Sequence, residues 1–163
     1  MLAEQVDSNG PVRIERVGDA APVHAACALF DGPPLLGATE RFLQAPGHHL
    51  LLAYHDGERA SGTAAQAVGM VSGIEMTHPD KGTEMFLYEL SVVPTHRDRG
   101  IGTALVRALV ALATERGCYG MWVATEGDNR AALATYRRAG ATQDEPFVAL
   151  TWRFQTAATE RAG

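Results

Sequence analysis

The segment 95–106 reads THRDRGIGTALV, with two glycines between basic residues and an apolar, helix-like stretch. Because glycine has no Cβ, consecutive backbone N–H groups here can close around a diphosphate, and the dipole of a following helix favours an anion. Arg97 and Arg99 add cationic side chains beside the glycines. The pattern predicts either a phosphate-binding loop or a tight strand-to-helix turn that requires small residues.

Two common phosphate-binding loops do not fit these glycines. The dinucleotide-binding pattern G-x-G-x-x-G, started at Gly100, has Leu105 where the third glycine belongs. The nucleoside-triphosphate pattern G-x-x-x-x-G-K-[ST] occurs nowhere in the sequence. What remains is an arginine, Arg97, followed by Gly100 and Gly102 at the start of a helix.

Apart from Glu84 at its start, the strand-like segment EMFLYELSVV has one carboxylate, Glu89, in the middle of its apolar run, and it is the second candidate for chemistry. Strand alternation predicts that Glu89 shares a face with Met85, Leu87, Ser91 and Val93. A carboxylate among apolar side chains is costly unless it is used or paired. Glu89 is therefore expected either to act as a base or to form a salt bridge with an arginine.

The elements that must position these residues follow from hydrophobic periodicity and turn signals. Strands are expected at residues 12–17, 48–55, 64–76, 84–93, 118–125 and 147–154. Helices are expected at residues 19–30, 36–45, 100–116 and 129–139. This order predicts a mixed α/β domain in which the glycine loop follows the first strand of a crossover connection.

The bulk composition is that of one ordinary globular domain. The 163 residues are 46% hydrophobic and 20% charged, with a net charge of −5. That charge argues against nucleic-acid binding and suits a cationic ligand, although solubility alone also explains it. We expect a flexible leader at 1–10, a single domain at 11–155 and a flexible tail at 156–163.

The remaining sequence features exclude some locations and ligands. Two distant cysteines, the lack of an N-terminal secretory pattern and the lack of an apolar run of about 20 residues predict a cytoplasmic protein without membrane contact. Five of the six histidines lie in or beside the expected strands and turns and show no ligand spacing, so we expect no metal and interpret them as surface or turn residues. These five are His48, His49, His55, His78 and His96.

Two motifs together resemble those of the GNAT superfamily of acetyl-CoA-dependent N-acetyltransferases. ELSVVPTHRDRGIGTALVRALVALATERG is similar to its strand, pyrophosphate loop and helix, and GDNRAALATYRRAG to its Asn-x₆-Tyr helix. The resemblance covers residues 48–154 well and the N-terminal third weakly. It implies an α+β fold with a mostly antiparallel sheet of six to seven strands and helices on both faces. It also implies that strands 84–93 and 118–125 run parallel and splay apart.

The resemblance implies a binding site for acetyl-CoA along the first splayed strand and the glycine loop. Val92 N–H is then the donor that polarises the thioester carbonyl, and the loop amides hold the pyrophosphate. The implied cofactor-binding residues are Leu90, Ser91, Val92, Val93, Arg97, Asp98, Arg99, Gly100, Ile101, Gly102, Thr103, Asn129 and Tyr136.

The resemblance also gives roles to the second helix motif. Asn129 and Tyr136 are two helical turns apart, so they project on nearly the same side. By resemblance, Tyr136 protonates the departing CoA thiolate, whereas the alternative is a core aromatic with its hydroxyl at the rim. Asn129 either contacts the cofactor or caps its helix.

N-acetylation requires a neutral amine, and an alkylammonium has a pKa of about 10. Glu89 is the expected general base. Asp31, Glu89, Glu126 and Asp128 are the expected substrate-binding residues, and for Glu126 and Asp128 the alternative is that they are solvated loop acids.

Within the superfamily the sequence looks most like the aminoglycoside 3-N-acetyltransferases, which pair an aromatic and an acidic residue as in Tyr88-Glu89. The expected partners are a cationic small-molecule amine and, as is common in the superfamily, a second copy in a homodimer. Polyamines, amino acids and protein N-termini are alternative acceptors. An acyl-CoA-binding sensor without turnover is the alternative from another class, and it would need neither Glu89 nor Tyr136.

Overall fold

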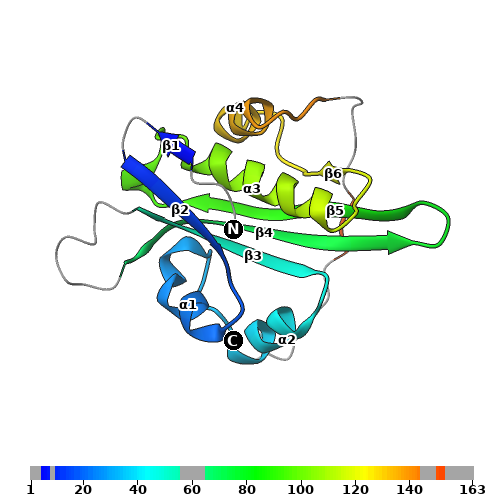
Figure 1. The fold of residues 1–163 in the computed structure, drawn as a ribbon, viewed down its shortest axis with the longest axis horizontal. Coiled ribbons are helices and arrows are strands. Elements are labelled where there is room, and N and C mark those ends of the chain that lie inside the picture. Colours follow the sequence, from blue (N-terminus) through cyan, green and yellow to red (C-terminus); the bar gives the residue numbers. More distant parts are fainter. Residues whose placement is uncertain (1–4, 8–9, 56–64, 144–149, 153–163) are drawn as a thin grey trace.

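The computed structural model describes residues 5–7, 10–55, 65–143 and 150–152. In these residues six strands form one sheet in the order β1-β2-β3-β4-β5-β6, antiparallel except for the parallel pair β5–β6 (Figure 1). The strands are β1 (Gln5–Asp7), β2 (Gly10–Arg16), β3 (His48–His55), β4 (Ala67–His78), β5 (Gly82–Val92) and β6 (Met121–Trp122). The helices are α1 (Ala20–Ala25), α2 (Leu36–Gln44), α3 (Ile101–Glu115) and α4 (Arg130–Arg138), with 3₁₀ turns η1 (Cys27–Leu29) and η3 (Pro94–His96). The predicted α+β class and mostly antiparallel sheet are confirmed.

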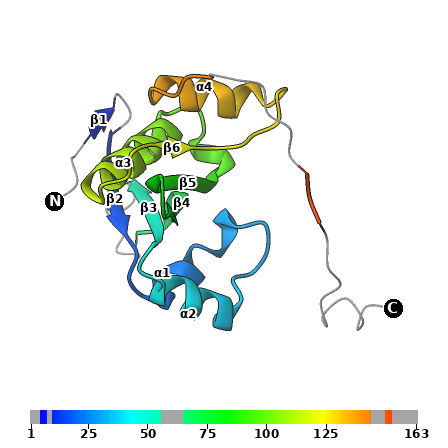
Figure 2. The same cartoon turned by 90° about the vertical axis from the view of Figure 1, so that its right-hand side faces the viewer.

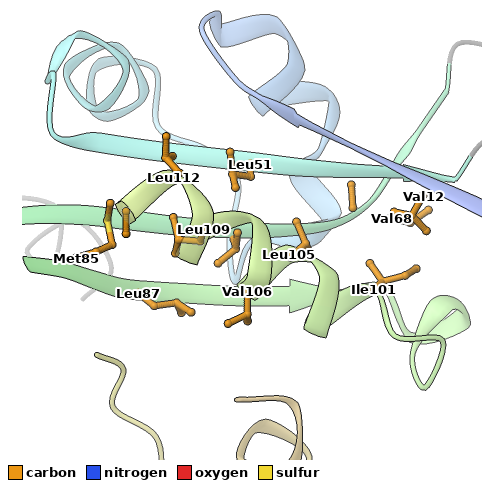
Figure 3. Close-up of a cluster of buried hydrophobic side chains, with 13 residues drawn as sticks. Val12, Leu51, Val68, Met85, Leu87, Ile101, Leu105, Val106, Leu109 and Leu112 are labelled. Carbon is orange, nitrogen blue, oxygen red and sulfur yellow. The ribbon is translucent and has the colours of Figure 1, made fainter. Parts of the chain in front are cut away.

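Helices cover both faces of the sheet, as predicted. Figure 2 shows α3 and α4 on one side and α1 and α2 on the other. The α3 face carries a core that includes Leu51, Met85, Leu105 and Leu109, all fully buried (Figure 3). A second cluster forms under α1, η1 and α2. Two apolar layers therefore fix the sheet between the helices.

Two glycines let α3 lie directly on the sheet. A Cβ added to Gly73 on β4 would meet Leu109 Cδ1 and Met85 Sδ at 2.8 Å each, and one on Gly69 would meet Leu105 Cδ1 at 3.0 Å. Only glycine accommodates such an approach without displacing its neighbours. The close contact fixes the position of α3, and hence of the glycine loop from which α3 begins.

Several predicted elements differ from those observed. β1 was not predicted, because residues 1–10 were expected to form a leader. The first helix ends at Ala25 and continues only as the η1 turn. β6 is shorter than the predicted strand 118–125, because β5 and β6 diverge after the Phe86–Trp122 pair. In the predicted strand 147–154, residues 150–152 carry no strand, and the other positions lie outside the described residues.

The expectation that all the histidines lie at the surface or in turns is wrong for His49. Its side chain is fully buried on β3, and its Nε2 donates to Glu75 Oε1 at 2.7 Å. Arg116 Nε donates to the same carboxylate oxygen at 2.6 Å. This cluster could not be predicted from the sequence, because its members are far apart in the chain and meet across β3, β4 and the end of α3.

None of the helices in the described part of the chain is long and apolar enough to cross a membrane.

Candidate active site

A β-bulge in β5 determines where Glu89 points. Glu89 pairs with Ser72 on β4, whereas Leu87 pairs with the next residue, Gly73, so Tyr88 is an extra residue in the ladder. An extra residue shifts every following side chain to the opposite face of the strand. The predicted face shared by Glu89, Met85 and Leu87 is therefore wrong.

The packing on either side of the bulge shows the switch directly. Before it, Met85 and Leu87 are buried in the core beneath α3. After it, Leu90 and Val92 pack against that core, and both lie within 3.8 Å of a Cβ built on Gly102 of α3. Alternation then turns Glu89 toward the opposite face of the sheet, the side of α1 and α2. We call the part of this face on β5 and β6 the acceptor face.

Among the described residues, β5 has an open edge beyond its first residues. β6 pairs with it at Met85–Met121 and Phe86–Trp122, and the two parallel strands separate after that point. Val93 N–H donates to Val68 O on β4 at 2.9 Å. Because N–H groups alternate in direction along a strand, those of Leu90 and Val92 point to the open edge.

This orientation separates the four predicted backbone contacts into two pairs. Leu90 and Val92 present their amides to the open edge, whereas Ser91 and Val93 turn theirs toward β4. The carbonyl of Val92 also lies on the open side, where it accepts a hydrogen bond from Arg97 Nε at 3.0 Å. Arg97 therefore holds the end of β5 to the loop that follows, a role its sequence position did not reveal.

The glycine loop has the backbone geometry of an anion site. Asp98 and Gly100 both have positive φ, 58° and 79°, and α3 begins directly after at Ile101. No side chain in the described ranges caps this helix, so the amides of its first turn are available to an anion. Arg99 and Asp98 are exposed in the loop, and Gly102 and Thr103 stand in the first turn. These groups fit a diphosphate.

Glu89 is half-buried on the acceptor face, and its pKa is raised. Burial is the larger cause, because removing water disfavours the carboxylate, and the negative charge of Asp31 is the second. Asp31 lies between η1 and α2, so the structure brings two predicted substrate-binding residues from distant parts of the chain near each other. Within the described part of the chain, no arginine is among the causes of the shift, which favours the base over the salt bridge.

α4 carries the other two predicted motif residues. Tyr136 is half-buried against the α3 core, and burial raises the pKa of its phenol, which keeps the proton on its oxygen. Asn129 caps the helix, its Oδ1 accepting from Ala132 N–H at 3.1 Å. Arg107 on α3 donates to the carbonyl of Arg138 at 2.9 Å and ties the end of α4 to α3.

The two remaining acids stay apart from this arrangement. Glu126 and Asp128 are exposed in the loop between β6 and α4, where Glu126 O accepts from Asn129 N–H at 3.0 Å. Among the described residues, no group of three or more histidine, cysteine or acidic side chains could hold a metal ion.

Two aromatic residues that the sequence analysis did not single out, Phe86 and Trp122, lie with Tyr88 on the acceptor face. Phe86 stacks on Trp122 with ring centroids 4.3 Å apart and meets Tyr88 edge-on at 5.9 Å. Their cross-strand pairing could not be read from the sequence, although Tyr88 stood beside Glu89. A splayed strand pair, an uncapped helix after a glycine loop and a half-buried carboxylate together suit an acyltransferase that uses a donor with a diphosphate group.

The comparison with protein families agrees with that class. Residues 22–141 match the acetyltransferase (GNAT) family, and the chain belongs to this family. Its members use acetyl-CoA as the acetyl donor, and the loop and the open strand edge described above fit that molecule. A curated relative, mycothiol acetyltransferase of Clavibacter sepedonicus, is 40% identical over 76 residues, which are 47% of this chain but only 25% of the relative.

Solved structures with the same fold cover nearly all of the chain. An aminoglycoside acetyltransferase from an uncultured soil metagenomic sample, in complex with sisomicin, superposes with a TM-score of 0.75 at 18% identity, covering 88% of this chain and 97% of the other. The aminoglycoside N-acetyltransferase AAC(6')-Iy, in complex with CoA, gives 0.70 at 21% identity, covering 87% and 100%. At these identities the likeness establishes the fold alone.

Proposed function

We propose that this protein transfers the acetyl group of acetyl-CoA directly to a primary amine of a cationic small molecule. The observation that carries the proposal is the position of Glu89. Its half-buried carboxylate has a raised pKa and stands three residues from Val92, whose N–H points to the open edge of β5. The proposed base and the proposed oxyanion donor are therefore on the same strand. The acceptor amine can approach Glu89 from the acceptor face, and acetyl-CoA can approach Val92 N–H from the open edge of β5.

The reaction forms a C–N bond and breaks the C–S bond of the thioester. Glu89 accepts the proton that the amine must lose, and its raised pKa brings its proton affinity closer to neutral pH, where a base is most effective. Val92 N–H donates to the carbonyl oxygen as negative charge develops there, a contribution of about 3 kcal/mol for a well-placed donor. Tyr136, whose raised pKa keeps it protonated, supplies the proton to the leaving thiolate.

The glycine loop holds the donor during this step. In the proposed complex, the amides from Asp98 to Thr103 surround the pyrophosphate and the dipole of α3 favours its charge. Leu90 and Val92 pair with the pantetheine arm through the backbone groups at the open edge. Arg97 supports the site by fixing the end of β5. In the proposed complex, Asn129 contributes mainly by capping the N-terminus of α4, the helix that carries Tyr136.

An aminoglycoside is the proposed acceptor. Such molecules carry several ammonium groups, and Asp31, whose charge reaches Glu89 and helps to raise its pKa, provides a second negative charge to bind one of them. The exposed Glu126 and Asp128 would attract the cation toward the site. We retain the 3-amino group as the site of transfer, on the sequence pattern around Tyr88-Glu89, because the fold likeness to AAC(6')-Iy says nothing about position.

Release of CoA thiol tests this function. The purified chain is incubated with acetyl-CoA and, separately, with gentamicin, sisomicin, spermidine, free amino acids and peptides. Rapid thiol release with the aminoglycosides and two-dimensional NMR of a 3-N-acetyl product are the expected results. Thiol release only with another class of amine would show that the proposed acceptor is wrong. A 6'-acetyl product would show that the proposed position of transfer is wrong. Binding of CoA without thiol release in the presence of any amine would mean that the protein is a binding module and not an enzyme.

We also propose a cytoplasmic homodimer. Both cysteines are free thiols, as suits a reducing compartment. Leu150 and Trp152, in the described stretch near the C-terminus, are each 76% exposed, which makes them candidates for burial in a dimer. The chain has a mass of 17.4 kDa, and analytical ultracentrifugation should give twice that value. A Trp152→Asp variant should weaken the association. A monomer at all concentrations would contradict the dimer.

A further inference from the structure

Phe86, Tyr88 and Trp122 form a cluster of aromatic rings at the protein surface, which we call the aromatic platform. The Phe86 and Trp122 rings are 4.3 Å apart and tilted by 30°, and Tyr88 meets Phe86 at 88°. Tyr88 is 67% exposed and Trp122 39% exposed. The rings support one another, yet they leave apolar surface open to solvent, which is unlike the buried aromatic packing of a core.

The platform lies on the same face of the sheet as Glu89. Met85 and Met121 pair across β5 and β6, and both pack toward the α3 core. Alternation turns their neighbours, Phe86 and Trp122, to the other face. The bulge at Tyr88 then brings Glu89 to that same face, so the aromatic rings and the carboxylate share the acceptor face.

The order of these residues along β5 gives the site a direction. Val92 stands nearest the loop, Glu89 follows three residues back, and Phe86 lies a further three residues back. Because of the bulge at Tyr88, the partners of Glu89 and Phe86 on β4, Ser72 and Ile74, are only two residues apart, so at about 3.3 Å per residue the Glu89 and Phe86 backbones are about 7 Å apart along the strand. An amine that reaches Glu89 with its nitrogen toward Val92 must therefore place the rest of its molecule toward the platform.

We propose that the aromatic platform determines acceptor specificity by binding the face of a ring that carries the reactive amine. Aromatic rings bind flat apolar faces, and they also attract a nearby ammonium group. An amino sugar and an arylalkylamine both present such a ring, and a linear polyamine does not. The inference rests on the proposed acetyl transfer, since it concerns the acceptor of that same site.

Fluorescence offers a test that needs no turnover. The chain has two tryptophans, so Trp152→Phe leaves Trp122 as its sole tryptophan. With CoA present, titration with sisomicin or 2-phenylethylamine should shift or quench the Trp122 emission to saturation, while spermidine should leave it unchanged. A response to sisomicin would show that the platform binds an amino-sugar ring, and a response to 2-phenylethylamine would show that it binds an aryl ring. No response to either ring amine, or an equal response to spermidine, would overturn the platform.

Steady-state kinetics test the same idea by mutation. Tyr88→Ala and Trp122→Ala should each raise KM for the ring-bearing substrate about 3- to 10-fold, the range of an aromatic contact, and leave KM for spermidine unchanged. Tyr119→Ala is the matched control, because Tyr119 is 59% exposed and precedes β6. Equal losses for ring-bearing and linear amines would refute the inference. Absence of transfer to every amine would instead refute the proposed function, and the fluorescence titration would still report on the platform.

Discussion

Replacing Glu89 by glutamine tests the base most directly. Glutamine has the same shape, so it removes the charge and the proton acceptor while keeping the half-buried contacts of Glu89 on β5. An alkylamine with a pKa of about 10 is neutral in only about one molecule in 10³ at pH 7. A variant without a base depends on that fraction, so we expect turnover at pH 7 to fall about 10²- to 10³-fold.

The pH profile separates a catalytic from a structural role. The loss in the Glu89→Gln variant should shrink about tenfold for each unit of pH as the amine deprotonates unaided, and nearly vanish close to pH 10. In the unchanged protein, turnover should fall on the acid side around the raised pKa of Glu89. Because Asp31 contributes to that shift, Asp31→Asn should move this acid limb to lower pH. Both effects can be measured from thiol release in a series of buffers at constant ionic strength.

One result would refute this reasoning. If Glu89→Gln loses the same factor at every pH while its thermal unfolding midpoint also drops, Glu89 supports the fold and does not take the proton. A variant with wild-type turnover at pH 7 would exclude Glu89 altogether.

Three further predictions follow from other parts of the structure. Tyr136→Phe should lower turnover but leave the affinity for acetyl-CoA, measured by calorimetry, nearly unchanged; unaltered turnover removes Tyr136 as the acid. Gly100→Val forces a β-branched residue to φ 79°, so it should abolish CoA binding, and retained affinity would contradict the loop assignment. Burial lowers the pKa of His49, so the unfolded chain binds its proton first and the free energy of unfolding should decline below about pH 6.5, by up to about 1.4 kcal/mol per pH unit, in urea titrations. An equal decline in a His49→Gln variant would assign the effect to other groups.

The sequence was sufficient for most of the fold and for the site residues on a single element. β3 was predicted at its observed bounds, and α3 to within a residue at each end, because their apolar patterns are long and their ends are marked by turn residues. Asn129 could be read as a cap for the same local reason. Features that depend on pairing between strands could not be predicted from the sequence. Examples are the length of β6 and the buried contact of His49 with Glu75.

The bulge at Tyr88 is a feature of strand pairing that determines the direction of two site residues named from the sequence, Glu89 and Val92. Met85 N–H donates to Gly120 O on the β6 side, so without an extra residue the amide of Val92 would point toward β4. The side chain of Glu89 would likewise point into the core beneath α3, with Met85 and Leu87. Because side-chain direction and backbone direction change together, one inserted residue turns the carboxylate to the acceptor face and the Val92 amide to the open edge. The proposed base and the proposed oxyanion donor therefore depend on the same local distortion, and a deletion that restores the regular ladder should remove both at once.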